Sequence, residues 1–384
     1  MMSAVHTPGS PPLVITGMHR SGTSLLASLF ASAGVSLGTR LIGASRGNDR
    51  GHYEDLDFYD FHAAALEANG LRAEGFACVD EIGVPPAMRE SAATLVAGKA
   101  AAGEIWGWKD PRTSLFLDFW GEVLPEARFV FVFRSPWEVV DSLFRRGDQT
   151  FTVNPAAAAR VWLHYNRRIV DFYRRNHSRS VLAEVTEVVA YPSALFASVR
   201  QRLGVAVGEP LPRYEERLLV RDGLGRREAI IAALLPEAIE LYAEMRRLTG
   251  QPARTQPQHA DAAAVAAEHA IGEWSRAAIA EDGGRRLEAE NVAAREALRA
   301  AEARCAALDL EKRAIEGRLR EVQDVREALA AQVRERVLEE SRQARHGEAV
   351  WAERAQARTA PAAPEDRSSV GGWTSRDSTG ADHS

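Results

Sequence analysis

Apolar and polar positions along the chain follow two different periods, and the changes of period separate strands from helices. Apolar runs with the length of a buried strand occur at three places: Leu13–Thr16, Arg128–Phe133 and Ser180–Val189. Apolar residues at helical spacing predict three helices: Thr23–Ala33, Trp137–Arg146 and Pro155–Asn176. Because strands and helices alternate, the fold class is predicted to be α/β, with a central, mostly parallel sheet between two layers of helices.

The pattern changes after about residue 250 and divides the chain into five segments. Residues 12–250 form the α/β domain, and residues 251–284 are an Ala-rich linker with scattered proline. Residues 285–348 consist almost entirely of Ala, Glu, Arg, Leu and Val, which predicts a long helix or coiled coil. Residues 1–11 and 349–384 lack such patterns, and both ends are expected to be disordered.

A heptad repeat runs through the helical segment. One position of the repeat holds Leu287, Ala294, Ala301, Leu308, Ile315, Val322 and Leu329. Its companion position, half apolar, holds Asn291, Leu298, Cys305, Lys312, Leu319, Arg326 and Val333. This arrangement predicts a coiled-coil stripe with polar interruptions, and a second copy of the chain, giving a homodimer, is its simplest partner. The alternative is a single solvated helix stabilised by Glu–Arg pairs four residues apart.

Composition limits the class of protein. The chain has 384 residues and a net charge of −5, so it has no overall affinity for nucleic acid. Cys78 and Cys305, its two cysteines, lie far apart, which favours a reducing cytoplasm over a disulfide framework. No run approaches the roughly 18 apolar residues of a membrane span, and the N-terminus does not resemble a signal peptide. We therefore expect a soluble, cytoplasmic protein.

The segment Gly17–Ser24 joins the first strand to the first helix. Such a turn directs backbone N–H groups and the positive end of a helix toward one point, which makes an anion site. It almost matches the nucleotide-binding P-loop pattern G-x-x-x-x-G-K-[ST], but Thr23 replaces the lysine. The domain is therefore expected to be P-loop-like and nucleotide-binding, with the loop cation supplied by Arg20.

This loop resembles that of a known superfamily. Residues Arg20–Ser24 are similar to the [KR]-x-G-T-[TS] loop of sulfotransferases that depend on 3′-phosphoadenosine 5′-phosphosulfate (PAPS). The resemblance implies that Arg20 contacts the bridging oxygen and the sulfuryl group. It also implies that the 5′-phosphate is held by Ser21, Gly22, Thr23 and Ser24.

Two further segments extend the resemblance, which covers about residues 13–204. Arg134 ends a strand and Ser142 follows eight residues later, the spacing with which this superfamily holds the donor's 3′-phosphate. An alternative is that Arg134 pairs with Glu138. Lys109 belongs to a K-D-P-R turn like that of bacterial and glycan sulfotransferases, which implies that it faces the donor sulfate or the acceptor. The alternative is a surface turn.

The resemblance also suggests a general base. Residues Asn48–Glu54 resemble the N-x-x-G-[HY]-[FY]-E turn of glycan-type relatives, in which the glutamate removes the acceptor proton. Glu54 is therefore the preferred base, His52 the reserve, and Asp55 and His19 further candidates. Glu54 could instead cap a helix. Glu187 stands one position away from an acid that many relatives share, and its role is open.

Together these features predict a PAPS-dependent sulfotransferase that uses no metal. Its acceptor is expected to be a hydroxyl, and the glycan-type motifs favour a saccharide or glycolipid. Two alternatives have the same loop: a P-loop kinase for a small molecule, which would need the missing lysine, and a catalytically inactive scaffold acting through the coiled coil.

Overall fold

The computed structural model describes residues 10–43, 51–99, 105–211, 224–251 and 264–358. Most of the expected N-terminal segment and C-terminal tail lies outside the described residues, as do Asn48–Arg50 of the glycan-type turn and residues 252–263 of the expected linker. The chain divides into two units, Met1–Glu290 and Asn291–Ser384. The limits of the five segments given above remain predictions.

A four-stranded sheet forms the centre of the first unit. Its strands are β1 (Leu13–Thr16), β2 (Gly107–Lys109), β3 (Arg128–Phe133) and β4 (Ser180–Glu184). They lie in the order β2-β1-β3-β4, and every neighbouring pair is parallel. The predicted parallel α/β fold is therefore confirmed. All four strands end at the same edge of the sheet, where doubly wound α/β folds bind their ligands.

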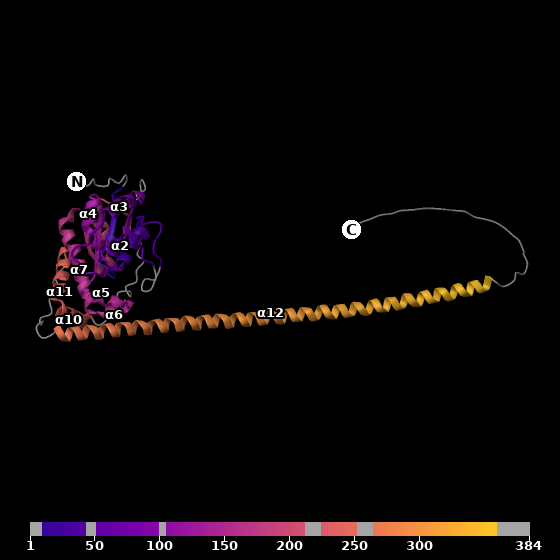
Figure 1. Cartoon of the computed structure of the whole chain (residues 1–384). Helices are drawn as coiled ribbons and strands as arrows, with labels where there is room; N and C mark the ends of the chain where they lie inside the picture. Colours follow the sequence, from indigo (N-terminus) through magenta and orange to yellow (C-terminus); the bar gives the residue numbers. More distant parts are fainter. Residues whose placement is uncertain (1–9, 44–50, 100–104, 212–223, 252–263, 359–384) are drawn as a thin grey trace, which may run out of the picture. The chain divides into compact units, whose positions relative to one another are not determined.

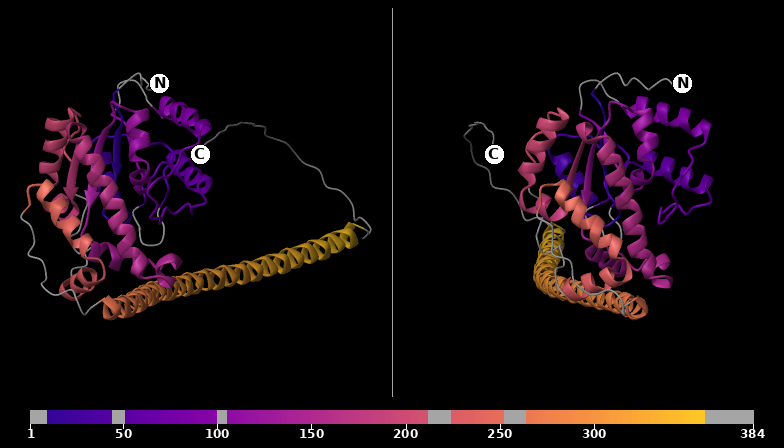
Figure 2. Two further views of the ribbon diagram at one scale, coloured as in Figure 1. Left: turned by 60° about the vertical axis from the view of Figure 1, so that its left-hand side comes forward. Right: turned by 90° about the vertical axis from the view of Figure 1, so that its left-hand side faces the viewer.

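Alternating side chains of the strands face two separate cores. On β3, Phe129, Phe131 and Phe133 belong to one apolar cluster, whereas Val130 and Val132 belong to the other. Helices cover both faces, so the domain has three layers (Figure 2). A sheet buried on both sides needs strands that are apolar at successive positions, as the sequence of β3 is.

The valine face of β3 is covered by α1 (Thr23–Ser32), α8 (Val185–Ala190), α9 (Pro192–Ser198) and a π-helical turn (Val199–Leu203). The phenylalanine cluster includes residues of the remaining helices, whose bounds are: α2 (Leu56–Ala68), α3 (Pro86–Lys99), α4 (Leu117–Val123), α5 (Pro136–Arg146), α6 (Gln149–Val153), α7 (Ala156–Arg175), α10 (Leu224–Leu234), α11 (Pro236–Leu248) and α12 (Ala264–Arg358). Two short 3₁₀ turns, Pro111–Leu115 and His177–Arg179, complete the fold.

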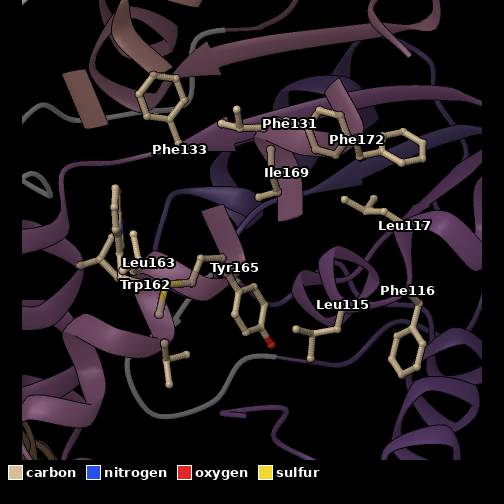
Figure 3. Packing of buried hydrophobic residues seen from close by; sticks show 14 of the residues in the cluster. Leu115, Phe116, Leu117, Phe131, Phe133, Trp162, Leu163, Tyr165, Ile169 and Phe172 are labelled. Carbon is tan, nitrogen blue, oxygen red and sulfur yellow. The ribbon is translucent and has the colours of Figure 1, made fainter. Parts of the chain in front are cut away.

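Helix α7 provides much of the larger core. Ile169 and Phe172 of this helix lie beside Phe131 of β3, and the rings of Phe172 and Phe131 have centroids 6.0 Å apart (Figure 3). The sequence predicted this helix over Pro155–Asn176 from apolar residues at helical spacing, and α7 spans Ala156–Arg175. Its packing fixes β3, and hence the position of Arg134, which directly follows the strand.

The strand predicted over Ser180–Val189 is too long. β4 ends at Glu184, and α8 begins at Val185. Val185 and Val188 are buried three residues apart, on one helical face within the smaller core. Tertiary packing has therefore overridden the strand preference of this valine-rich segment.

The first turns of α12 pack on the domain. Ala267, Ile271, Trp274 and Ala278 are buried at the spacing of one helical face. Further along, in the second unit, large apolar side chains of the same helix are exposed, for example Leu308 and Ile315. Figure 1 shows α12 as one continuous helix. The predicted long helix is therefore present, and its pairing with another helix remains a prediction.

Candidate active site

The loop between β1 and α1 is held close to the sheet by its glycines. A β-carbon on Gly17 would stand 2.2 Å from the carbonyl oxygen of Val132, so only glycine fits at this position. Gly22 has a φ of 94°, in the left-handed region that glycine favours, and caps the N-terminus of α1. The loop therefore runs directly over the carboxyl end of the sheet and into a helix N-terminus, as an anion site requires.

Arg20 adopts a backbone conformation that is rare for its residue type. Its φ is 67°, a left-handed value that non-glycine residues seldom take. In this conformation Arg20 Nε donates a hydrogen bond to Ser142 Oγ at 2.9 Å, which joins the loop to α5. Strain of this kind is concentrated at functional sites, where the surrounding structure holds it in place.

Three guanidinium groups lie close together beside the loop. Burial, and then the neighbouring charges of Arg146 and Arg134, lower the pKa of Arg20 to about 10, so it stays charged at neutral pH. Asp148 and Asp282 oppose this effect more weakly. Arg146 also pairs with Asp148 at 2.6 Å, so part of this positive charge is balanced within the domain.

Two buried donors near these arginines make no hydrogen bond within the described part of the chain: Ser21 Oγ and Arg134 Nε. Another nitrogen of Arg134, Nη2, pairs with Glu138 at 3.3 Å, as the alternative interpretation expected. That pair leaves Nε unused. Buried donors are seldom left unpaired, because each costs about 1–3 kcal/mol. These donors, together with Arg20, fit an anionic group such as a phosphate.

Lys109 and Glu54 form a second, buried cluster next to the loop. Lys109 Nζ donates to Ser24 Oγ at 3.1 Å, to the His52 carbonyl at 2.6 Å and to Glu54 Oε1 at 2.7 Å. An ammonium has three N–H donors, so all of them are used. Burial lowers the pKa of Lys109, while the Glu54 carboxylate opposes that shift. Lys109 thus ties the beginning of α1 to the proposed base.

The same cluster continues away from the loop. Arg112 Nη2 donates to Glu54 Oε2 at 3.1 Å, and Arg112 Nε donates to Asp110 Oδ1 at 2.9 Å. Burial would raise the pKa of Asp110, but Arg112 and His62 outweigh it and hold the pKa below its usual range. His62 Nε2 accepts from Trp120 at 2.9 Å, so Nδ1 carries the proton that bonds Asp110. Asp110 and Arg112 therefore connect Glu54 rigidly to the core.

The other candidates for the base occupy different surroundings. Asp55 accepts from the backbone N–H of Asp57, capping α2, and its other oxygen pairs with Lys99 at 2.7 Å. His52 is half-buried, and burial lowers its pKa. His19 packs against Phe76, with ring centres 5.0 Å apart. Burial, and then Arg112, lower the pKa of His19 well below its ordinary value, so its imidazole is neutral.

A hollow of about 300 Å³ lies next to Phe76, the ring that packs against His19. It is lined mainly by residues 70–79 and includes Phe76, Arg72 and Glu74. The ring of Phe76 also lies under the guanidinium of Arg146, at 5.4 Å. One lining residue of the hollow, Phe76, therefore contacts both His19 and Arg146.

Sequence reasoning missed two charged groups at this edge of the sheet. Arg146 belongs to the arginine cluster, and its position four residues after Ser142 on α5 was a signal that could have revealed it. Glu184 ends β4, is buried, and accepts a hydrogen bond from the Tyr242 hydroxyl. The rule that singled out Arg134, a polar residue at a strand's end, applies equally to Glu184.

A further buried carboxylate stands next to Ser142. Asp141 accepts from Trp274 Nε1 at 2.9 Å and from Arg145 Nε at 2.8 Å, and it pairs with Arg227 at 3.2 Å. Trp274 belongs to α12 and Arg227 to α10, so Asp141 fixes both helices on α5. This group of contacts positions the helix that carries Ser142.

Within the described ranges, no three His, Cys, Asp or Glu side chains are grouped as metal ligands. Among the helices that the structure describes, none has the length and apolarity needed to cross a membrane. Both described cysteines are free.

The fold and the site together define a class: an α/β protein with a P-loop-like anion site at the carboxyl edge of a parallel sheet. The sequence model of the sulfotransferase family matches residues 11–206, just over half of the 384 residues. The chain therefore belongs to the sulfotransferase family. The matched region contains the loop, Glu54, Lys109, Arg134 and Ser142.

Several solved structures are similar to the chain. A sulfotransferase from Alicyclobacillus acidocaldarius has 13% identity and a TM-score of 0.40, covering 63% of this chain and 97% of that protein. The sulfotransferase domain of the Synechococcus PCC 7002 olefin synthase has 17% identity and a TM-score of 0.35, covering 70% and 97%. Sulfotransferase STF9 from Mycobacterium avium has 15% identity and a TM-score of 0.37, covering 63% and 77%. No curated protein sequence matches the chain.

Proposed function

We propose that this protein transfers a sulfuryl group from PAPS to the hydroxyl of an acceptor, without a metal. The observation that carries the proposal is the arginine cluster beside the loop, with Ser21 Oγ and Arg134 Nε buried and unpaired within the described part of the chain. A donor with a phosphosulfate and a 3′-phosphate supplies the anions that such a site needs. The two free cysteines are in keeping with a cytoplasmic protein.

Arg20 is assigned the leaving group. Sulfuryl transfer is an in-line displacement in which negative charge develops on the bridging and 5′-phosphate oxygens of the donor. A guanidinium fixed before the reaction stabilises that charge without having to reorganise. The left-handed backbone and the bond to Ser142 hold Arg20 in one direction, which supports this role.

Arg134 and Ser142 are assigned the 3′-phosphate. Ser142 Oγ already accepts a hydrogen bond from Arg20, and its own hydrogen remains able to donate. Arg134 Nε has no bond partner in the described residues. These two donors would distinguish PAPS from nucleotides that lack the 3′-phosphate.

Glu54 is assigned the role of general base, with His52 in reserve. Each oxygen of Glu54 accepts one hydrogen bond from a cation, and each has a further lone pair for an acceptor hydroxyl. All three N–H donors of Lys109 bond to protein groups. We therefore assign Lys109 to positioning Glu54 against Ser24 rather than to direct contact with the sulfate. This assignment replaces the direct role that the turn motif suggested.

The acceptor is proposed to be a saccharide or glycolipid hydroxyl that enters through the hollow beside Phe76. Phe76 offers an aromatic face, and Arg72 and Glu74 offer polar groups, a combination suited to a sugar ring. Phe76, which lines the hollow, packs against His19, one residue before Arg20 in the loop, and this contact supports the proposed entrance.

Thermal unfolding with two ligands tests the proposed donor. The desulfated product, 3′-phosphoadenosine 5′-phosphate (PAP), should stabilise the protein by about 2.7 kcal/mol at 100 times its dissociation constant. ATP with Mg²⁺ should have no comparable effect. Stabilisation by ATP and Mg²⁺ alone would indicate a small-molecule kinase, and stabilisation by neither would indicate an inactive scaffold.

Glu54→Gln tests the base separately. The glutamine keeps the size of the side chain but cannot take a proton, so transfer to an added saccharide should fall at least about 100-fold. PAP binding should stay within about twofold. If binding and transfer fell together, Glu54 would be a structural residue, and His52→Ala would be the next variant to assay.

A further inference from the structure

Between residues 287 and 333, most of the exposed large apolar residues of α12 lie on one side of the helix. From residue 287 to 333, eight large apolar side chains stand on the heptad stripe, each 55–64% exposed: Leu287, Leu298, Leu308, Ile315, Leu319, Val322, Leu329 and Val333. Three lie elsewhere on the helix: Val292, Leu310 and Val325. An apolar stripe of this length on one helix, even with its polar interruptions, indicates a surface that binds another helix.

Ion pairs between residues of α12 itself do little to stabilise it as a single helix. Between residues 285 and 348, all described, the ion pairs four residues apart are Arg286–Glu290 at 3.7 Å and Lys312–Glu316 at 3.9 Å. All four of these side chains are more than half exposed, where such pairs contribute little. The single solvated helix is therefore the weaker of the two interpretations of this segment.

We propose that the stripe from Leu287 to Val333 binds the same stripe of a second copy as a parallel coiled coil in register. The partner is a second copy because the stripe is self-complementary: its positions alternate by three and four residues over seven heptads. This dimer is independent of the proposed reaction, since the stripe contains none of the residues assigned to it.

The polar positions of the stripe favour the parallel arrangement. Asn291 would face Asn291 of the second copy, and two amides can hydrogen-bond to each other. A polar residue at such a position sets register and strand number at a cost in stability. Lys312 and Arg326 have long apolar stems, so their charged ends can reach water beside the seam.

Charges beside the stripe support the same orientation. In a parallel pair in register, Arg304 lies by Asp309 of the second copy, an attractive pair. Glu311 lies by Glu316 of the second copy, and Lys312, already 3.9 Å from Glu316 of its own chain, stands between them.

In an antiparallel pair, the register that leaves no position of the stripe unpaired brings like charges together. It places Arg304 by Arg318 of the second copy, and Glu302 by Glu316 of the second copy. Like charges across a seam of this kind disfavour the pairing. Charge complementarity therefore selects the parallel dimer.

Two leucines two residues apart provide a matched test of the surface. Leu308 is on the stripe and 63% exposed, and Leu310 is off it and 67% exposed. In full-length protein measured by sedimentation equilibrium, Leu308→Glu should raise the dimer dissociation constant roughly 100-fold or more, since two buried leucines are lost together. Leu310→Glu should leave it within about threefold. A monomeric wild-type protein, or equal effects of the two variants, would overturn the proposal.

Cys305 tests the orientation. It lies on the stripe, so a parallel pair in register places it opposite Cys305 of the second copy, whereas the antiparallel register places it by Ile315 of the second copy. In a Cys78→Ser background, mild oxidation of the purified dimer should convert most of the chains to a disulfide-linked pair, and Cys305→Ser should abolish the link. A stable dimer that does not cross-link would overturn the parallel register.

Both tests are separate from the proposed reaction. PAP stabilisation of the Leu308→Glu variant should match that of the wild-type protein, so loss of the dimer and loss of donor binding are observed independently.

Discussion

The α/β domain and the exposed part of α12 differ in the kind of unfavourable group that each contains. The domain buries charge: the side chains of Lys109 and Arg112 are 1% and 3% exposed. The helix exposes apolar groups, with Leu308 63% and Ile315 57% exposed. Buried charge without a partner and exposed apolar surface both cost free energy in an isolated chain.

The regions differ in how far other groups of the same chain compensate for this unfavourable free energy. Around Glu54, Lys109 and Arg112, carboxylates and cations satisfy each other. Beside Arg20, Ser21 Oγ and Arg134 Nε are buried with no hydrogen-bond partner among the described residues, and the apolar stripe on α12 is exposed along the described helix. We infer that each unmatched region marks a binding partner, an anionic donor for the domain and a second helix for α12.

The largest effect is expected for Arg20→Ala. Removing a fixed cation from the developing charge should slow transfer by about 10³-fold, on the order of 4 kcal/mol. The release of PAP from PAPS in water measures this without knowledge of the acceptor. Arg40→Ala is the matched control, since Arg40 is 62% exposed and pairs only at the surface. Turnover of Arg20→Ala near the wild-type rate would refute the proposed mechanism.

Arg134→Ala should show that the arginine cluster recognises a particular phosphate. Losing a charged hydrogen bond costs about 1.5–3 kcal/mol, so PAP affinity should fall roughly 10- to 150-fold in titration calorimetry. Adenosine 5′-phosphosulfate, which lacks the 3′-phosphate, should lose less than about threefold. Equal losses for both ligands would mean that Arg134 supports the fold or the 5′ side instead.

Much of the fold was predictable because its signals are local. β1 and β3 have the predicted bounds, since runs such as Phe129–Phe133 are apolar at every position and can only be buried on both faces. The end of β4 was missed because valine favours strands, and the packing that makes Val185 helical depends on distant residues. The order of the strands in the sheet likewise depends on pairing between distant segments, which no local sequence pattern encodes.

Those parts of the candidate site that lie within one segment, such as the loop Gly17–Ser24, could be predicted from the sequence. Contacts between segments were not predictable: the bond from Arg20 to Ser142 spans 122 positions, and that from Lys109 to Glu54 spans 55. The sequence correctly placed Lys109 at a strand end, but it could not show that all three of its donors bind protein groups. The link from Trp274 to Asp141 was invisible for the same reason.

Trp274→Phe tests whether the first turns of α12 stabilise the domain. Phenylalanine keeps most of the packing but leaves the buried Asp141 carboxylate without one donor, which should lower the free energy of unfolding by about 1–3 kcal/mol. Trp351→Phe, on the same helix but 75% exposed, should change it by less than about 0.5 kcal/mol. Urea unfolding followed by circular dichroism measures both. Equal, small effects would mean that the first turns of α12 do not help to stabilise the domain.

The smallest effect concerns pH and follows from burial of an ionisable ring. Burial lowers the pKa of His19 in the folded domain, so the unfolded chain takes up a proton at a higher pH than the folded one. The free energy of unfolding should therefore decrease as the pH falls below about 6.5, the ordinary value for histidine, by up to about 1.4 kcal/mol per pH unit for this one group. His52 and His164, whose pKa values burial also lowers, add to the decrease.

His19→Gln removes one of these groups and should make that decline shallower between pH 6.5 and 5. His269→Gln, at a 75% exposed position on α12, should leave it unchanged. Chemical denaturation at a series of pH values compares the two. If both variants kept the wild-type pH dependence, the histidine of the loop would be equally protonated in the folded and unfolded states. The loop would then carry an additional positive charge, an imidazolium, only below about pH 6.5.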